Sequence, residues 1–170
     1  MGAVARRRHG HPGGAVAGVI EVRHEPPDSP AATALFDEYM ELVRERAGRD
    51  MRDAEHIFAT AEAFDGPGSA WLVVYDGEQP VACGGLRPLE PGTGEIKRMF
   101  VSAAARRRGH ARRLLGELET ISRDAGHKRV RLLTTELLPE AIALYKSTGY
   151  TVVSSHVEDG HTDYWLEKDL

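Results

Sequence analysis

Four arginines around one glycine form the part of the sequence best suited to chemistry. Residues 106–111 read Arg-Arg-Arg-Gly-His-Ala, and Arg112 follows. They come after a run of strand-forming residues, 95–101, and open a segment with the leucine spacing of a helix. The first turn of a helix has backbone N–H groups without partners, and the helix dipole is positive there. Because Gly109 would let a ligand approach that backbone closely, the pattern predicts a site for phosphate or pyrophosphate.

Other interpretations of this segment fit less well. Three consecutive arginines could be a solvated helix start, but the dipole disfavours cations there unless a ligand balances them. A Walker loop needs Gly-Lys-Ser/Thr at the helix start, whereas His110 follows Gly109. A dinucleotide fingerprint needs spaced glycines after its strand, whereas Gly92 and Gly94 precede it.

The distribution of charge also points to an anionic ligand. The 170 residues include 22 Lys and Arg and 26 Asp and Glu, which gives a net charge of −4. Of the basic residues, 11 lie between Lys97 and Arg131, against three acidic residues in the same stretch. The basic run has no interleaved aromatic residue that could stack on bases, so a nucleic-acid module is disfavoured.

Several classes of protein are excluded by composition. No stretch approaches the roughly 20 apolar residues of a membrane helix, and the single Cys83 excludes an internal disulfide and a cysteine-only zinc site. We therefore expect a cytoplasmic protein with no metal site. Residues 1–17 are basic and rich in glycine, and we expect a disordered tail there, in which His9 and His11 are not metal ligands.

Hydrophobic periodicity and turn residues predict a single domain over residues 18–170. We expect a loop at 88–94, strands at 18–24, 70–75, 80–86, 95–101, 129–134, 150–156 and 162–166, and helices at 30–48, 52–64, 107–125 and 139–148. The strand–helix–strand unit over 95–134 should be parallel with a right-handed crossover, and the other neighbours favour hairpins. The predicted class is α/β (α+β), with a mixed central sheet of six or seven strands flanked by about four helices.

Two segments resemble the signatures of a known family. Arg106-x-x-Gly109-x-Ala111, placed after a strand and at the start of a helix, is similar to the Arg/Gln-x-x-Gly-x-Gly/Ala signature of the GNAT superfamily of acyl-CoA-dependent N-acetyltransferases. Residues 141–150, AIALYKSTGY, resemble its second signature, a helix that carries a tyrosine and is followed by Gly-Tyr/Phe. The order of elements is also that of the family, and the resemblance covers residues 18–170.

The resemblance implies an N-acetyltransferase with a GNAT-like fold and acetyl-CoA as co-substrate. It implies that Glu95 accepts a proton from the acceptor amine, directly or through water, and that Tyr145 lies near the CoA sulfur. The remaining implied contacts are with the coenzyme, the pantetheine arm pairing with the backbone of Met99, Phe100 and Val101 and the pyrophosphate binding at Arg106, Arg107, Arg108, Gly109, His110, Ala111 and Arg112. Glu95 as a solvated strand residue and Tyr145 as a core aromatic are the alternatives.

The chemistry of acetyl transfer is intelligible from these residue types. An amine is protonated at neutral pH and must lose a proton before it can attack. The tetrahedral intermediate needs a fixed donor for its oxyanion, such as an N–H of the central strand, and the thiolate leaves more easily beside a hydroxyl. Direct attack by the amine requires no covalent acyl-enzyme. Cys83, in an apolar strand, is therefore expected to be a small buried residue rather than a nucleophile.

The acceptor pocket of the family is shaped by the first two helices and the final hairpin. Phe36, Tyr39 and Tyr164 are the predicted substrate contacts, with Glu41, Arg44 and Trp165 near them. This mixture favours the primary amine of a small polar molecule. Acetylation of a protein lysine or N-terminus stays open as an alternative, as does a non-catalytic acyl-CoA sensor. Assembly into a homodimer also stays open. We expect the turn between His156 and His161 to line the acceptor site, and His110 and His127 to lie at the surface.

Overall fold

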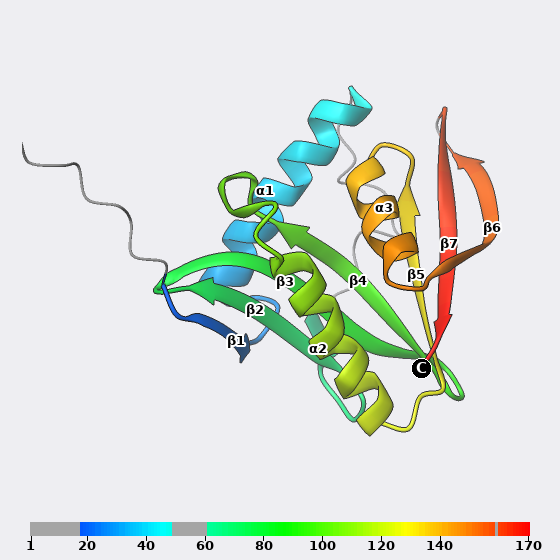
Figure 1. Cartoon of the computed structure of the whole chain (residues 1–170), viewed down its shortest axis with the longest axis horizontal. Coiled ribbons are helices and arrows are strands. Elements are labelled where there is room, and N and C mark those ends of the chain that lie inside the picture. Colours follow the sequence, from blue (N-terminus) through cyan, green and yellow to red (C-terminus); the bar gives the residue numbers. More distant parts are fainter. Residues whose placement is uncertain (1–17, 49–60, 159) are drawn as a thin grey trace, which may run out of the picture.

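A seven-stranded mixed sheet organises the chain in a computed structural model, which describes residues 18–48, 61–158 and 160–170. The order across the sheet is β1-β2-β3-β4-β5-β7-β6 (Figure 1). The strands are β1 (Ile20–His24), β2 (Ala70–Asp76), β3 (Gln79–Glu90), β4 (Thr93–Val101), β5 (Arg129–Thr135), β6 (Thr151–Glu158) and β7 (His161–Asp169). The α-helices of the described ranges are α1 (Pro30–Ala47), α2 (His110–Asp124) and α3 (Pro139–Ser147). The predicted fold class is confirmed.

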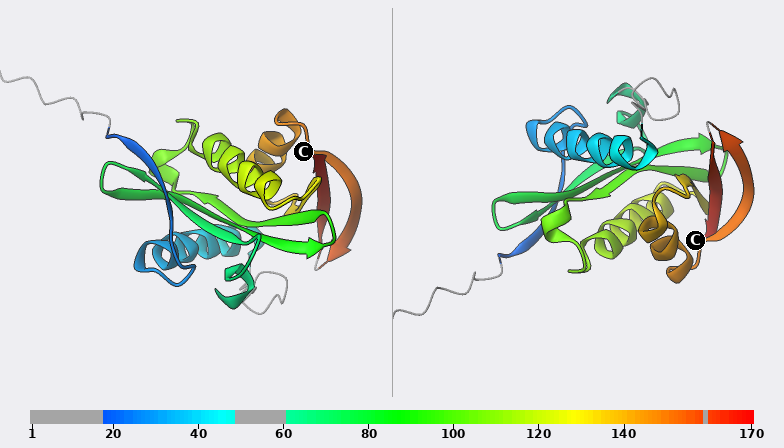
Figure 2. Two further views of the ribbon diagram at one scale, coloured as in Figure 1. Left: turned by 90° about the horizontal axis from the view of Figure 1, so that it is seen from below. Right: turned by 90° about the horizontal axis from the view of Figure 1, so that it is seen from above.

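The helices cover the two faces of the sheet separately. Figure 2 shows α1 on one face and α2 and α3 on the other. Leu114, Leu115 and Leu118 of α2 are buried against the β2–β4 part of the sheet, as their helical spacing predicts. On the opposite face, Leu35 of α1 packs in a cluster with Trp71 and the strand residues around it.

The parallel strands β4 and β5 are paired over only part of their length. Their ladder runs from Thr93↔Arg129 to Ile96↔Leu132, which confirms the predicted parallel unit. β4 continues to Val101, while β5 goes on to pair with β7 as far as Thr135↔Asp163. Figure 1 shows the two strands separating beyond their paired ends. The two central strands of the sheet are therefore not paired beyond Ile96 and Leu132.

The ends of α1 follow the local sequence. The Ser29 hydroxyl accepts a hydrogen bond of 3.2 Å from the Ala32 backbone N–H, Pro30 occupies the first turn, and Gly48 ends the helix with φ of 69°. Of the helix predicted over 52–64, residues 52–60 lie outside the described ranges, and 61–64 form a single 3-10 turn. The tail predicted over 1–17, with its two histidines, also lies outside them.

Three other predictions need correction. The second long helix begins at His110 rather than near Arg107, because Arg107 and Gly109 have φ of 61° and 84°, which a right-handed helix does not allow. The predicted loop at 88–94 is only a tight turn, since β3 extends to Glu90 and β4 starts at Thr93. His110 and His127 are 4% and 9% exposed and lie inside the domain, not at its surface.

Three further features complete the description of the fold. Cys83 is buried, 1% exposed. None of the described helices has the length and apolar character needed to cross a membrane. β6 forms an edge of the sheet, and its Val152, Val153 and Val157 are exposed.

Candidate active site

The first feature of the site is an irregularity in the pairing of β4 with β3. Cys83 of β3 pairs with Phe100 and Gly85 pairs with Lys97, so β4 has one residue more than β3 between these pairs. This is a β-bulge, and Arg98 within it has φ of 56°, a left-handed conformation that is uncommon for a residue with a side chain. Side chains alternate between faces along a regular strand, whereas here Lys97, Arg98 and Met99 all line one cavity.

A groove of about 580 Å³ lies between the end of β4, the start of α2 and the length of α3. Most of the predicted coenzyme contacts line it, namely Met99, Phe100, Val101, Arg106, Arg107, Gly109, His110, Ala111 and Arg112. Tyr145 lines it from α3. Arg108 does not, because its exposed side chain pairs with Asp76 of β2 at 3.4 Å.

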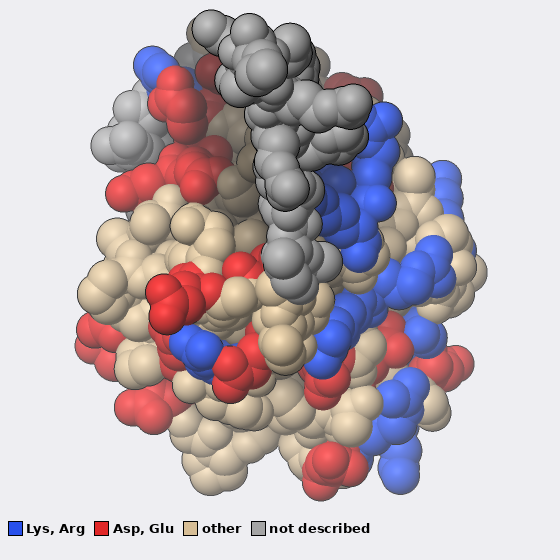
Figure 3. Space-filling model, turned by 60° about the vertical axis from the view of Figure 1, so that its left-hand side comes forward, with Lys and Arg blue, Asp and Glu red and all other residues tan. Residues whose placement is uncertain are grey.

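The start of α2 presents backbone donors and positive charge to this groove. Gly109 precedes the helix with φ of 84°, and the first turn contains no acidic residue. Arg106 is held by a 3.2 Å hydrogen bond from its Nε to the Val101 carbonyl, and Arg112 by one of 3.2 Å to the Ser147 hydroxyl. Figure 3 shows Lys and Arg side chains gathered along one side of the molecule, apart from most of the acidic ones. These features suit an anionic ligand.

One buried imidazole faces the same groove. His110 is 4% exposed, and its Nε2 is a buried nitrogen without a hydrogen-bond partner among the described residues. Buried polar atoms in folded proteins almost always have partners. A ligand in the groove could provide this one.

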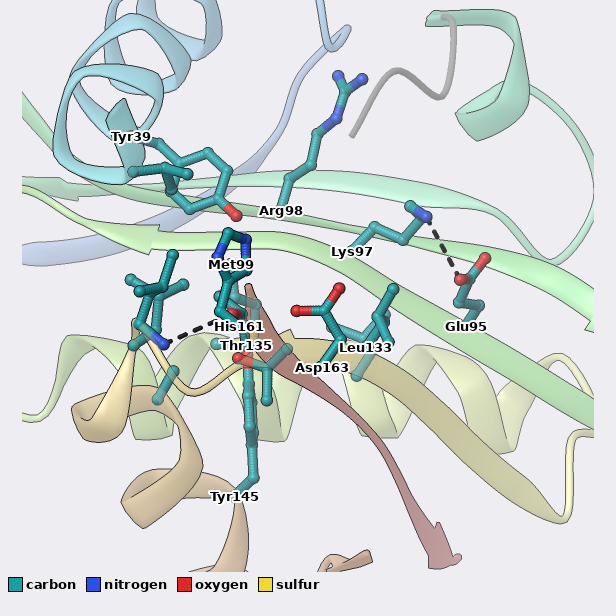
Figure 4. Close-up of a pocket in the computed structure, with 16 residues that line it drawn as sticks. Tyr39, Glu95, Lys97, Arg98, Met99, Leu133, Thr135, Tyr145, His161 and Asp163 are labelled. Carbon is teal, nitrogen blue, oxygen red and sulfur yellow. Dashed lines mark hydrogen bonds and ion pairs between the residues drawn. The ribbon is translucent and has the colours of Figure 1, made fainter. Parts of the chain in front are cut away.

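A smaller cavity of about 90 Å³ adjoins the groove (Figure 4). The cavity and the groove share Tyr39, Met99, Leu138, Ala141 and Tyr145 as wall residues. The other side of the cavity is polar, with Glu95, Lys97, Arg98, Thr135, His161 and Asp163. A long ligand in the groove and a small one in the cavity would meet at the shared wall.

Glu95 is a buried, doubly paired carboxylate at one end of the cavity. It is 1% exposed, so the alternative of a solvated strand residue is wrong. The Arg87 Nε donates to its Oε2 at 2.6 Å, and the Lys97 Nζ lies 3.4 Å from its Oε1. Burial lowers the pKa of Lys97, and the negative charge of Glu95 opposes this shift. Its role as a proton acceptor stays a prediction.

Two tyrosines form the wall between cavity and groove. Burial raises the pKa of Tyr145 above its ordinary value and raises that of Tyr39 to about 12. Both phenols therefore keep their protons at neutral pH and are available as hydrogen-bond donors. The Tyr145 ring packs against Tyr150 with 5.7 Å between centroids, which fixes its direction from α3.

The predicted acceptor residues are only partly brought together. Tyr39 lines the cavity, and the Phe36 ring lies 6.1 Å from the ring of Tyr39 and 4.5 Å below the Arg98 guanidinium. Tyr164 lies on the opposite face, packed against the core under α2 and α3, and lines neither space. Trp165 lies 5.9 Å from the Arg131 guanidinium, and Glu41 pairs with Arg44 on α1 at 3.1 Å.

Asp163 and Thr135 are site residues that the sequence reasoning missed. They are paired in the register of β5 and β7, so their side chains lie side by side on one face. The alternation of side chains along a strand at 161–169 could have placed Asp163 and Tyr164 on opposite faces of the sheet. Of the turn expected to line the acceptor site, His161 lines this cavity, and its contact with an acceptor stays a prediction.

Comparison with known proteins agrees with this architecture. Residues 30–150 match the family model described as Acetyltransferase (GNAT) family. The uncharacterized N-acetyltransferase YjgM of Escherichia coli is 37% identical over 109 residues, which is 62% of this chain and 59% of that protein. This chain thus spans little more than half of that relative's length.

Solved structures share the fold at low sequence identity. An acetyltransferase from Streptococcus agalactiae superposes with a TM-score of 0.73 at 17% identity, over 89% of this chain and 98% of that one. A Bacillus anthracis protein solved in complex with acetyl coenzyme A gives a TM-score of 0.59 at 14% identity, over 64% of this chain and 67% of that one.

Proposed function

Because this chain belongs to the acetyltransferase (GNAT) family, we propose that it transfers an acetyl group from acetyl-CoA to the primary amine of a small polar molecule. The amine attacks the thioester directly, through a tetrahedral intermediate. One observation carries the proposal: a groove with a cationic helix start and a small polar cavity share a wall that contains Tyr145. This arrangement suits two substrates that react where they meet.

The groove suits the coenzyme in charge and hydrogen bonding. The Gly109 turn and the arginines around it would hold the pyrophosphate. The unpartnered Nε2 of His110 offers a further contact to a polar ligand. At the other end, the backbone of Met99, Phe100 and Val101 would pair with the pantetheine arm as an added strand, because β5 has turned away from this part of β4.

The chain's own groups would then carry the proton transfers. Bound acetyl-CoA supplies a thioester carbonyl open to attack and a thiolate leaving group. Glu95 accepts the proton that the ammonium group must lose, directly or through a water. A backbone N–H of β4 stabilises the negative oxygen. The Tyr145 hydroxyl donates a hydrogen bond to the departing sulfur, and its raised pKa favours donation of that bond over full loss of the proton.

The size of the cavity supports a compact acceptor. Its volume of about 90 Å³ accommodates an amine and a few atoms beyond it. The direct test is a screen of amino acids, aminoglycoside-type amines, polyamines and peptides for acetyl-CoA-dependent thiol release. Acetylation of a small amine would support the proposal. Acetylation of peptides alone would indicate a protein acetyltransferase, and tight acetyl-CoA binding without turnover would indicate a sensor.

A further inference from the structure

Asp163 is a nearly buried carboxylate in the wall of the small cavity. It comes from β7, is 5% exposed and lies beside Thr135 of β5. Figure 4 shows its carboxylate directed into the space that also receives Tyr39 and His161, with Tyr145 on the far side. The group therefore faces the place where the acceptor amine must lie if the proposed function holds.

The other buried or half-buried carboxylates around this part of the sheet, on α2 as well as on the strands, are tightly paired, and Asp163 is not. Glu119 accepts hydrogen bonds from Lys168 at 2.8 Å and Tyr150 at 3.0 Å. Glu167 accepts one from Arg131 at 2.6 Å, and Glu95 one from Arg87 at the same distance. For Asp163, the one ion pair within the described ranges is with His156 Nε2 at 3.8 Å, which is beyond hydrogen-bonding distance.

A buried carboxylate is costly unless a donor or cation compensates it. The cations that line the cavity have their own partners, since Lys97 pairs with Glu95 and the Arg98 guanidinium lies over the Phe36 ring. The neighbours Tyr39 and Tyr145 are phenols, which have no cationic form and which a raised pKa keeps neutral, so they supply no positive charge. Two histidines lie near Asp163: His156, at 3.8 Å, carries a charge only when protonated, and His161 lines the same cavity. A cationic molecule in the cavity would bring a compensating charge within hydrogen-bonding distance.

We propose that Asp163 binds the ammonium group of the acceptor and thereby selects amines that are cations at neutral pH. This inference rests on the proposed function and adds a specificity residue to it. The ammonium donates a hydrogen bond to the Asp163 carboxylate, which holds its nitrogen near the shared wall. One N–H bond then breaks, its proton goes to Glu95 directly or through water, and the freed electron pair attacks the thioester carbon, whose C=O π pair moves to the oxygen. When that pair returns, the C–S bond breaks, the thiolate leaves with its electron pair, and a second N–H proton passes to the thiolate or to water.

The test is Asp163→Asn, which keeps the shape and removes the charge. For an alkylamine acceptor found by the screen, the KM should rise roughly 10- to 100-fold, the range expected for one lost charged hydrogen bond. The kcat at saturating acceptor should stay within about threefold, and the KM for acetyl-CoA should not change. Asp169→Asn is the matched control, because Asp169 lies on the same strand but is exposed and pairs with Arg129. It should leave the acceptor KM unaltered.

Each outcome separates this inference from the proposed function. If the parent enzyme acetylates no amine, the proposed function fails. If it does so and Asp163→Asn has the parent's acceptor KM, the inference fails while the function stands. A fall in kcat alone would also overturn it, because Asp163 would then act on the proton transfer rather than on binding.

A second measurement needs no variant. The hydroxyl analogue of the acceptor, in which OH replaces the ammonium group, is tested as a competitive inhibitor of the parent enzyme. We expect it to bind at least about tenfold more weakly than the amine. Equal binding would overturn the inference even if Asp163→Asn did not fold.

Discussion

The Arg87 guanidinium donates a 2.6 Å hydrogen bond across the strands to Glu95, whose side chain is only 2% exposed. Together with Lys97 on its own strand, this partner fixes the Glu95 carboxylate at the end of the small cavity. Asp163 on β7 lines the same cavity. Two carboxylates on different strands thus line one small cavity, and the roles proposed for them can be distinguished by experiment.

Glu95→Gln should slow turnover at neutral pH by roughly 10²-fold, because the proton acceptor is lost. Part of the rate should return at high pH, where more of the acceptor amine is already neutral. The measurement is a pH–rate profile from pH 6 to 10. Glu90→Gln, an exposed change on the neighbouring strand, should retain the parent profile. If Glu95→Gln also keeps the parent's rate and profile, Glu95 is not the proton acceptor.

Tyr145→Phe should lower kcat by about 10²-fold and leave acetyl-CoA binding nearly intact, because only the hydroxyl beside the departing sulfur is removed. Steady-state kinetics and calorimetry measure the two effects. The control is Tyr75→Phe. It removes a hydroxyl that lies away from the groove and the cavity and donates a 2.6 Å hydrogen bond to Glu25. Full turnover by Tyr145→Phe would remove this hydroxyl from the mechanism.

Gly109→Glu should weaken acetyl-CoA binding more than tenfold, or over about 1.4 kcal/mol. It places a negative charge where the pyrophosphate should bind, at a position whose φ of 84° already disfavours a side chain. Gly116→Glu adds the same charge to the exposed side of α2 and should bind as the parent does. Equal affinities in two folded variants, measured by calorimetry, would place the coenzyme elsewhere.

Cys83 should be inert in the native protein. Burial raises the pKa of its thiol to about 12, so it stays protonated at pH 8, and thiolate is the reactive form. A thiol reagent such as DTNB should detect no thiol in the folded protein and one per chain after denaturation. The reagent can then follow CoA release without a background from the enzyme. Rapid reaction of the native protein would contradict the burial of this strand.

The sequence predicted the elements well where a repeating pattern reports on the backbone. Runs of strand-forming residues between turn signals located most of the strands, and the leucines of α2 identified its buried face. The pattern could not locate the start of α2, because the positive φ of Arg107 leaves no trace in hydrophobic spacing. Pro88 suggested a loop, yet it lies inside β3, where it pairs with Gly94.

The site was harder to predict where it depends on which face of a strand is used. Tyr164 and Asp163 are adjacent, so one faces the core under α2 and α3 and the other faces the cavity. Sequence reasoning chose the aromatic residue, although the register with β5 places the aspartate in the wall. The groups in the coenzyme signature were easier, because a short motif and a helix start keep them together.

Four residue pairs join β4 to β5, whereas β4 pairs with β3, and β5 with β7, at seven positions each. The β4–β5 ladder is the weakest connection in the sheet. The strands β1–β4 and β5–β7 are therefore two parts of the sheet joined by its shortest ladder. A pantetheine arm lying between β4 and β5 beyond that ladder would bridge the two parts and stiffen the domain. Deuterium uptake at the end of β4 should then fall when coenzyme is present, and the two parts should unfold together rather than apart.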